Sequence, residues 1–260
     1  MKKIDLVVAQ KLYESGKTLK EIGLIFDVSD ETIRTRFKKN GIIIKSKSEA
    51  KRKYILDEDF FNNIDDEFKS YFLGLIFSDG WVNKNTLSIQ LSEQDKDILI
   101  KFQESLKTIK PLIFKKAKKE THQNQFTLKV SSDKMINDLF KLGVCENKTH
   151  SLIFRTDFFN EKKLIKHFIR GVFDGDGTTY KAYFSIVGTE KFLVGIRDYL
   201  KQENINLGIY NAHCKSKDIK RLAFNNRAEL AKIFNYLYDD SNIFMDRKKN
   251  KFIDYFKKIK

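Results

Sequence analysis

The first forty residues have the hydrophobic spacing of three short helices. Apolar residues between positions 6 and 13 recur at helical intervals and predict a first helix. Thr18, with Glu21 three residues later, forms a capping box that predicts the start of a second helix. Ser29 is placed to cap a third helix, which is expected to end before Gly41.

This order of helices around a tight turn is similar to a helix-turn-helix, in which the third helix enters the DNA major groove. The third predicted helix is basic towards its end, which favours contact with a polyanion. The residues expected to face base edges are Thr32, Arg34, Thr35 and Arg36. A small three-helix bundle that mediates protein contacts is the alternative interpretation.

Beyond this segment, one hydrophobic pattern occurs twice. Residues 72–80 and 169–177 both read apolar, any, Gly, apolar, apolar, any, small, Asp, Gly. The two Asp-Gly ends, at Asp79 and Asp176, lie 97 residues apart (176 − 79). A unit of nearly one hundred residues is therefore present in two copies.

Each copy predicts a helix that ends at its Asp-Gly and carries small residues on one face. Gly74 and Ser78 are four residues apart and share a helix face, and so do Gly171 and Gly175. A glycine within a helix costs about 0.5–1 kcal/mol relative to alanine. The retention of a glycine in both helices indicates that the two small faces pack together at close range.

The two acids at the ends of these helices are candidates for metal binding. Asp79 and Asp176 fall at helix C-termini, where the helix dipole is already negative. A carboxylate in that position is unfavourable for stability but suitable for holding a divalent cation. If the two helices pack side by side, the carboxylates meet, and paired carboxylates with cations suit in-line displacement at a phosphodiester.

The remaining periodic segments predict the same order of elements in both copies. Alternating patterns predict strands at 86–92, 112–119, 125–130, 182–187, 208–213 and 220–225. Helical spacing predicts helices at 95–108, 135–142, 190–202, 228–238 and 247–258. The predicted fold class is α+β, with two αββαββα repeats containing antiparallel sheets and an all-α N-terminal domain. The expected divisions are 1–41, a basic linker at 42–58, a first repeat at 59–163 and a second at 164–260.

The two motifs, FLGLIFSDG and IRGVFDGDG, resemble those of the LAGLIDADG homing endonuclease family in its single-chain, two-motif form. The first copy departs from the family pattern at its sixth position, where Phe77 replaces the usual Asp. The resemblance implies a saddle-shaped fold with internal pseudo-twofold symmetry.

The resemblance also implies a set of site residues. Asp79 and Asp176 would hold Mg²⁺ or another divalent cation, with help from the carbonyls of Ser78 and Gly175. A basic residue from each repeat completes the site in the family. The matching positions here are Lys148 and Lys248, the second of which has Arg247 and Lys249 as neighbours that leave its register open.

Composition and charge agree with a nucleic-acid partner. The 260 residues carry a formal net charge of +15 and 41% hydrophobic residues, which is enough to fill a core. Two distant cysteines and four scattered histidines exclude a disulfide framework and a structural zinc site, and no apolar run reaches membrane-spanning length. The further candidates for DNA contact are Lys51, Arg52, Lys129, Lys220 and Arg221. For any single lysine, a solvated surface position is an equally good interpretation.

These features predict a monomeric, cytoplasmic, Mg²⁺-dependent endonuclease that cuts double-stranded DNA at an asymmetric site. One alternative is a transcriptional regulator that keeps the fold without cleavage. A second is an RNA-binding intron maturase. The presence of both motif acids favours the enzyme over the regulator.

Overall fold

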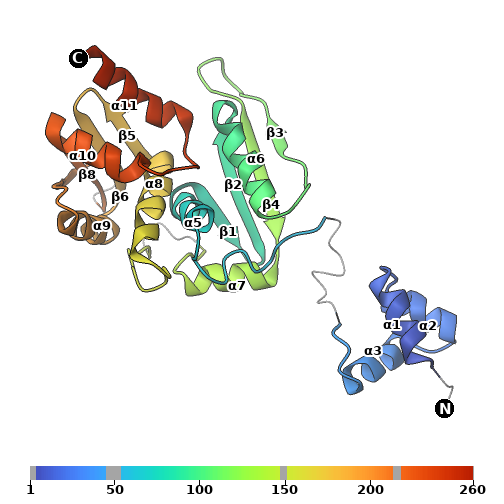
Figure 1. Cartoon of the computed structure of the whole chain (residues 1–260). Helices are drawn as coiled ribbons and strands as arrows, with labels where there is room; N and C mark the ends of the chain where they lie inside the picture. The colour runs from blue at the N-terminus through green and yellow to red at the C-terminus, as the bar shows by residue number, and fades with distance from the viewer. Residues whose placement is uncertain (1–3, 45–53, 147–150, 213–217, 260) are drawn as a thin grey trace. The chain divides into compact units, whose positions relative to one another are not determined.

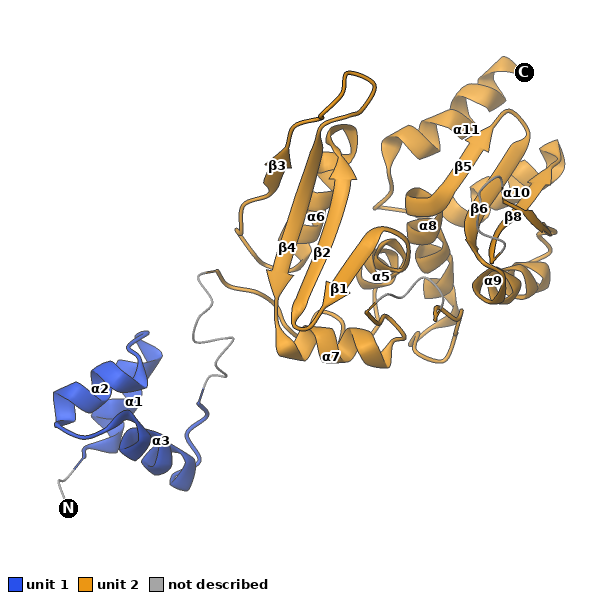
Figure 2. Cartoon of the chain, turned by 180° about the vertical axis from the view of Figure 1, so that it is seen from behind, with its two compact units in different colours: residues 1–53 blue, residues 54–260 orange. Residues whose placement is uncertain are grey.

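A computed structural model of the chain describes residues 4–44, 54–146, 151–212 and 218–259. The chain forms two compact units, residues 1–53 and residues 54–260, which are coloured separately in Figure 2. Each unit has its own hydrophobic core.

The first unit contains the three predicted helices, α1 (Leu6–Glu14), α2 (Leu19–Phe26) and α3 (Asp30–Lys39). The predicted capping box is present, since Thr18 accepts from the backbone of Glu21 and Glu21 bonds back to Thr18. Asp27 adopts the left-handed conformation with φ 51°, which turns the chain between α2 and α3. Ser29 caps α3 through a bond from the Thr32 N–H.

A small core holds these helices together. Ile33 and Phe37 of α3 are fully buried, and the rings of Tyr13 and Phe37 meet edge to face at 5.5 Å. A Cβ on Gly23 would collide with the backbone carbonyl of Val28, so α2 and the turn approach as closely as a glycine allows. These contacts fix α3 against α2.

The second unit contains two halves that share the order αββαββα, and the second half continues into one further helix, α11 (Figure 1). The first half comprises α5 (Glu67–Asp79), β1 (Gly80–Asn83), β2 (Thr86–Ser92), α6 (Lys96–Ser105), β3 (Ile113–Lys115), β4 (Gln125–Ser131) and α7 (Asp133–Lys141). The second comprises α8 (Ile165–Asp176), β5 (Gly177–Tyr180), β6 (Tyr183–Thr189), α9 (Glu190–Gln202), β7 (Gly208–Asn211), β8 (Ile219–Asn225), α10 (Arg227–Tyr238) and α11 (Asp246–Lys258). The predicted α+β class and the αββαββα order are confirmed.

Each half forms an antiparallel sheet, with strand orders β1-β2-β4-β3 and β5-β6-β8-β7. In the first sheet, Leu87 and Ile89 of β2 face the helices and are buried. Trp81, Ser88 and Lys129 lie side by side in register on the opposite face. Among the described residues, the helices α6, α7, α9 and α10 pack on the opposite sides of the two sheets. We call the faces that bear Lys129 and Arg221 the open faces, although the small residues Ser185 and Ala223 of the second face are buried.

The sequence patterns did not locate the strands β1 and β5, which begin directly at the end of the motif helices. Gly80 and Gly177 have φ −74° and −91°, so neither glycine is needed for a left-handed turn. A Cβ on Gly80 would collide with Ile76, and one on Gly177 with Phe173. Glycine at these positions permits a turn from helix into strand without a loop.

The second unit begins earlier than the predicted repeat boundary at residue 59. Leu56 packs against its core, and the Asp57 N–H donates to the Leu106 carbonyl at 2.9 Å. Residues 54–58 therefore belong to this unit and not to the linker. Among the residues that the structure describes, no helix is long and apolar enough to cross a membrane.

Candidate active site

The helices α5 and α8 lie side by side at the centre of the second unit, as both views show (Figures 1 and 2). A Cβ on Gly74 would collide with the carbonyl of Phe168, and one on Gly171 with the carbonyl of Tyr71. The glycines therefore mark the places where the two helix backbones come closest. This contact sets the spacing between the two halves.

The same contact brings the ends of the two helices together. A Cβ on Gly175 would collide with the Ser78 side chain and would lie 2.8 Å from Oδ2 of Asp79. The carboxylate of Asp79 therefore lies against the backbone that directly precedes Asp176. Asp79 is half-buried and Asp176 is exposed. All four predicted metal-site residues thus gather at one place.

The donor atoms at this place are the hard oxygens that Mg²⁺ prefers. Within the described ranges, no group of three or more His, Cys, Asp or Glu side chains could hold a metal ion. Mg²⁺ does not need such a cage, since it is commonly bound by one or two carboxylates and substrate phosphates, with water completing its octahedron. Asp79 and Asp176 are of the residue type that would hold a cation shared with a phosphodiester.

Lys248 of α11 extends into the same region. Its side chain is 5% exposed, lies over the Phe173 ring at 5.5 Å, and donates from Nζ to the Gly177 carbonyl. Burial, reinforced by Arg247, lowers the pKa of Lys248 to about 8, while the charges of Asp174 and Asp79 act in the opposite direction. Lys248 is therefore an ammonium group close to the acids at the helix ends.

The two neighbours of Lys248 point elsewhere. Arg247 donates from Nε to both oxygens of Asp95 at 2.8 Å, which ties α11 to the first half. Lys249 places its ammonium 3.8 Å from the centre of the Phe244 ring. Of these three adjacent cations, Lys248 is the one whose ammonium lies next to the end of α8, and its catalytic role stays a prediction.

Three other predicted residues, Lys51, Arg52 and Lys148, lie outside the described residues. The α3 candidates differ in their surroundings. Thr35 is exposed, whereas Oγ1 of Thr32 lies 2.9 Å from the capping Ser29 hydroxyl, and Nε of Arg34 lies 3.3 Å from Glu31. Arg36 is half-buried.

The sheet candidates divide between the two faces of their sheets. Lys129 and Arg221 lie on the open faces, and Arg221 holds its guanidinium 5.9 Å from the Tyr210 ring. Lys220 directly precedes Arg221 in β8 and lies on the same side as buried Leu222, with its Nζ donating to Asn211 at 2.8 Å. Strand alternation thus separates Lys220 from the open face.

The sequence interpretation missed the role of Asp174, the sixth residue of the second motif. Asp174 is fully buried, and its Oδ2 accepts from the Tyr71 hydroxyl at 2.8 Å and from the Met245 N–H at 2.7 Å. Burial raises the pKa of Asp174 to about 6, although both hydrogen bonds favour the carboxylate. The sequence contains one signal of this role, because the first copy has Phe77 at the position equivalent to Asp174.

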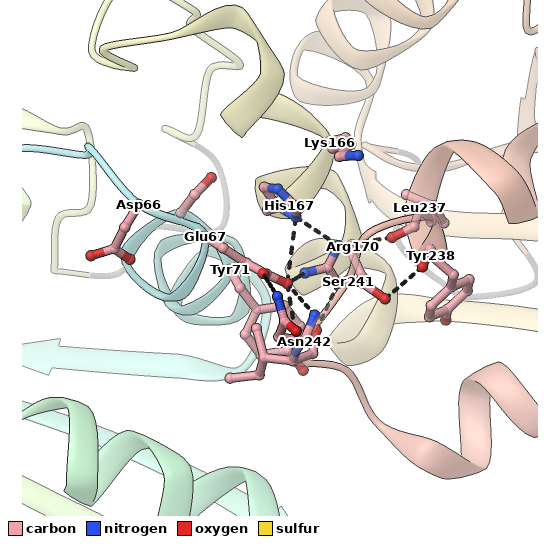
Figure 3. A network of polar contacts seen from close by, with 12 residues as sticks. Asp66, Glu67, Tyr71, Lys166, His167, Arg170, Leu237, Tyr238, Ser241 and Asn242 are labelled. Atoms are coloured by element: carbon pink, nitrogen blue, oxygen red, sulfur yellow. Dashed lines mark hydrogen bonds and ion pairs between the residues drawn. The ribbon is translucent and has the colours of Figure 1, made fainter.

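A second network, centred on Arg170, was also missed (Figure 3). The fully buried guanidinium donates to Oε1 of Glu67 at 2.5 Å, to the Ile243 carbonyl at 2.7 Å and to the Leu237 carbonyl at 2.8 Å. Glu67 also accepts from Asn242. An arginine inside an apolar motif helix, where the first copy has a leucine, was the signal in the sequence.

His167 completes this network. Its Nδ1 lies 2.8 Å from Nη1 of Arg170, which can only donate, so Nδ1 accepts and the imidazole is neutral. Burial, and then the charge of Arg170, lower the pKa of His167 to about 4. The network joins α5 of the first half to α8 and to the segment before α11 in the second half.

Comparisons with known proteins show similarity of fold alone. No family model matches this chain, and no curated protein matches it. Full-length DUF199/WhiA from Thermatoga maritima is 19% identical, with 78% of this chain and 65% of that chain covered and a TM-score of 0.49. The chain thus spans less than two thirds of that protein's length.

Two solved nucleases are similar at the same level. The meganuclease I-SmaMI bound to uncleaveable DNA is 14% identical, covering 74% of this chain and 88% of that chain with a TM-score of 0.48. The I-LtrWI LAGLIDADG homing endonuclease bound to target DNA is 14% identical, covering 78% and 91% with a TM-score of 0.47. At such low identity the likeness concerns the arrangement of helices and strands, and not activity or ligands.

Proposed function

We propose that this chain is a Mg²⁺-dependent endonuclease that cuts both strands of DNA at a specific, asymmetric site. The observation that supports this proposal is the contact of Asp79 with the backbone directly before Asp176, at the ends of α5 and α8. Lys248 lies within electrostatic range of Asp79. Two acids and a buried ammonium at the junction of two sheets are well suited to phosphodiester hydrolysis.

Each group has a distinct role in this proposal. Asp79 and Asp176, with the carbonyls of Ser78 and Gly175, would hold the cation. The bound metal would supply a Lewis acid for the phosphate and lower the pKa of a bound water. Lys248, whose pKa is about 8, carries its proton at neutral pH and places positive charge next to the anionic phosphate.

The open faces of the two sheets are the proposed DNA-binding surface. No helix of the described residues packs on these faces, and Lys129 and Arg221 are of the residue types that would contact bases or phosphates. The two halves have different side chains at equivalent positions, for example Trp81 and Thr178. A single chain with unlike halves would read an asymmetric duplex without a partner subunit. The first unit would bind an adjoining stretch of DNA through α3.

A regulator that binds DNA without cutting it is the second candidate. Phe77 is the observation in its favour, because the first motif has a buried aromatic ring where the second has an acid. Two other features favour the enzyme. Asp79 and Asp176 are both present, and burial of the Lys248 ammonium next to them is unfavourable for stability and therefore indicates function.

A selection experiment separates these candidates. The full chain is incubated with a randomised duplex library and Mg²⁺, and the ends produced are sequenced. We expect double-strand ends at one asymmetric sequence, and none when EDTA replaces Mg²⁺. Selective binding of one sequence without any new ends would instead establish the regulator.

A further inference from the structure

Asp174 is a buried acid that the proposed reaction does not use directly. It is the sixth residue of the second motif, two positions before Asp176, and it has no exposed surface. A carboxylate without solvent costs folding free energy unless it is well bonded. Its bonds from Tyr71 and Met245 therefore indicate what this carboxylate holds in place.

The bond to Met245 leads directly to Lys248. Met245 is the N-cap residue of α11, and its side chain makes no capping hydrogen bond to that helix. Its carbonyl accepts from the Lys248 N–H at 2.9 Å, so Lys248 lies in the first turn. Asp174 thus binds the residue from which α11 begins, and its negative charge is favourably placed at a helix N-terminus.

The Lys248 side chain is anchored at its other end. It passes over the Phe173 ring, three residues before Asp176, and its ammonium donates to the carbonyl of Gly177, directly after Asp176. The backbone of Lys248 is fixed through Asp174, and its ammonium is fixed next to Asp176. Both anchors belong to the second motif.

At the two equivalent positions of the first half, the described residues have no such carboxylate and hydroxyl. The repeat offset of 97 residues makes Phe168 the counterpart of Tyr71, and Phe77 the counterpart of Asp174. The rings of Phe77 and Phe168 meet edge to face at 5.0 Å, and Phe77 also stacks on Phe192 at 5.9 Å. An aromatic ring at this position has no carboxylate to accept a backbone N–H from a following segment.

We infer that Asp174 is a positioning residue that holds Lys248 next to the two acids, and that Lys248 serves the scission of one DNA strand because it belongs to the second half. This inference rests on the proposed nuclease function. The first half has an apolar pair, Phe77 and Phe168, where the second has Asp174 and Tyr71. Loss of Asp174 should therefore slow the scission of one strand and spare the other.

Three variants separate positioning from simple destabilisation. Asp174→Leu removes both acceptor oxygens and introduces an apolar side chain, as the first half has at Phe77. Asp174→Asn keeps one acceptor oxygen for the Met245 N–H. Tyr71→Phe removes the bond between α5 and α8 but leaves the bond between Asp174 and Met245 intact.

The measurement is single-turnover cleavage of a duplex labelled differently on each strand, at saturating protein. Asp174→Leu should slow one strand by at least about tenfold, since misplacing a catalytic group by about 1 Å can cost a hundredfold. A nicked intermediate should then accumulate. Asp174→Asn should restore most of that rate, and Tyr71→Phe should leave the ratio of strand rates unchanged. Equal slowing of both strands, or no change, would overturn the inference.

A second readout does not depend on cleavage. Lys248 is buried in the wild type, so an amine-acylating reagent should modify it slowly, as quantified by mass spectrometry. Asp174→Leu should raise that rate several-fold, and Tyr71→Phe should not. If wild type cuts neither strand but Lys248 becomes reactive in Asp174→Leu, the nuclease proposal fails and the positioning role stands. If Lys248 stays protected in Asp174→Leu, the positioning role fails.

Discussion

The guanidinium of Arg170 lies 2.5 Å from the carboxylate of Glu67, and this ion pair joins the motif helix of one half to that of the other. Arg170 is fully buried, and Glu67 has 13% of its side chain exposed. Removal of one partner from such a pair leaves a buried charge without compensation. The pair therefore makes the association of the two halves specific as well as tight.

Glu67→Ala should destabilise the second unit by about 3–5 kcal/mol, because it leaves Arg170 buried and unpaired. Urea unfolding of the full chain measures this change. Asp65→Ala is the matched control, since the ion pair of Asp65 with Lys69 is at a more exposed site and its loss should change stability by at most about 1 kcal/mol. Equal effects of the two substitutions would contradict the structural role of the ion pair.

His167 should make stability depend on pH. Its pKa is about 4 in the folded chain and about 6.5 in the unfolded chain, so the folded state binds fewer protons between these values. Stability therefore rises with pH in this window, and it is lost as pH falls from about 6.5 towards 4. At pH 5 the loss due to His167 should be about 2 kcal/mol relative to pH 7.5.

This pH effect is isolated by comparison with His167→Gln. Other groups, including Asp174 with its opposite shift, titrate in both proteins and cancel in the difference. The wild type should lose more stability than the variant between pH 7.5 and pH 5, as measured by urea unfolding at each pH. Parallel losses in the two proteins would show that His167 is not held neutral.

The contact between α5 and α8 is so close that even a methyl group at Gly74 or Gly171 should be too large. Gly74→Ala and Gly171→Ala each place a Cβ against the backbone of the opposite helix and should cost at least about 1–3 kcal/mol. Thermal unfolding reports the effect. Gly188→Ala is the matched control, because its Cβ would meet no atom closer than 3.4 Å. A lowered Tm in the control and not in the helix variants would contradict this packing.

Trp81 offers a direct test of where DNA binds. It is the only tryptophan in the chain, is 51% exposed, and lies on the open face of the first sheet, two residues after Asp79. Duplex DNA on that face should cover the indole and change its fluorescence, while the anisotropy of labelled DNA reports binding independently. Binding by anisotropy without any fluorescence change would place the DNA elsewhere.

Local sequence signals were sufficient for most elements of the fold. Helix α9 was predicted with its observed ends, because its apolar spacing is continuous between two clear boundaries. The strands β1 and β5 were not located, since each has only four residues and no loop separates it from the preceding helix. The turn from helix to strand depends on close contacts around Gly80 and Gly177, which periodicity does not encode.

The sequence pattern predicted the two site acids because both copies of the motif contain them. The repeated Asp-Gly ends predicted Asp79 and Asp176, whereas Asp174 and Arg170 differ between the copies and gave no repeated pattern. Their partners Met245 and Glu67 are 71 and 103 residues away in the chain. Contacts over such sequence separations cannot be predicted from local residue spacing. The sequence shows that the two copies differ at these positions, but the partners that give the differences a role became visible only in the folded chain.

In the proposed function, Asp79 and Asp176 hold the cation that promotes hydrolysis of DNA. The most direct test of this role compares wild type with Asp79→Asn and Asp176→Asn on the selected duplex in Mg²⁺, with binding measured in parallel in Ca²⁺. Each substitution keeps the shape of the side chain but removes its charge. We predict that both abolish double-strand cleavage while the Kd for the duplex changes by less than about tenfold, or about 1.4 kcal/mol. Full double-strand cleavage by either variant would contradict the assignment of these two acids.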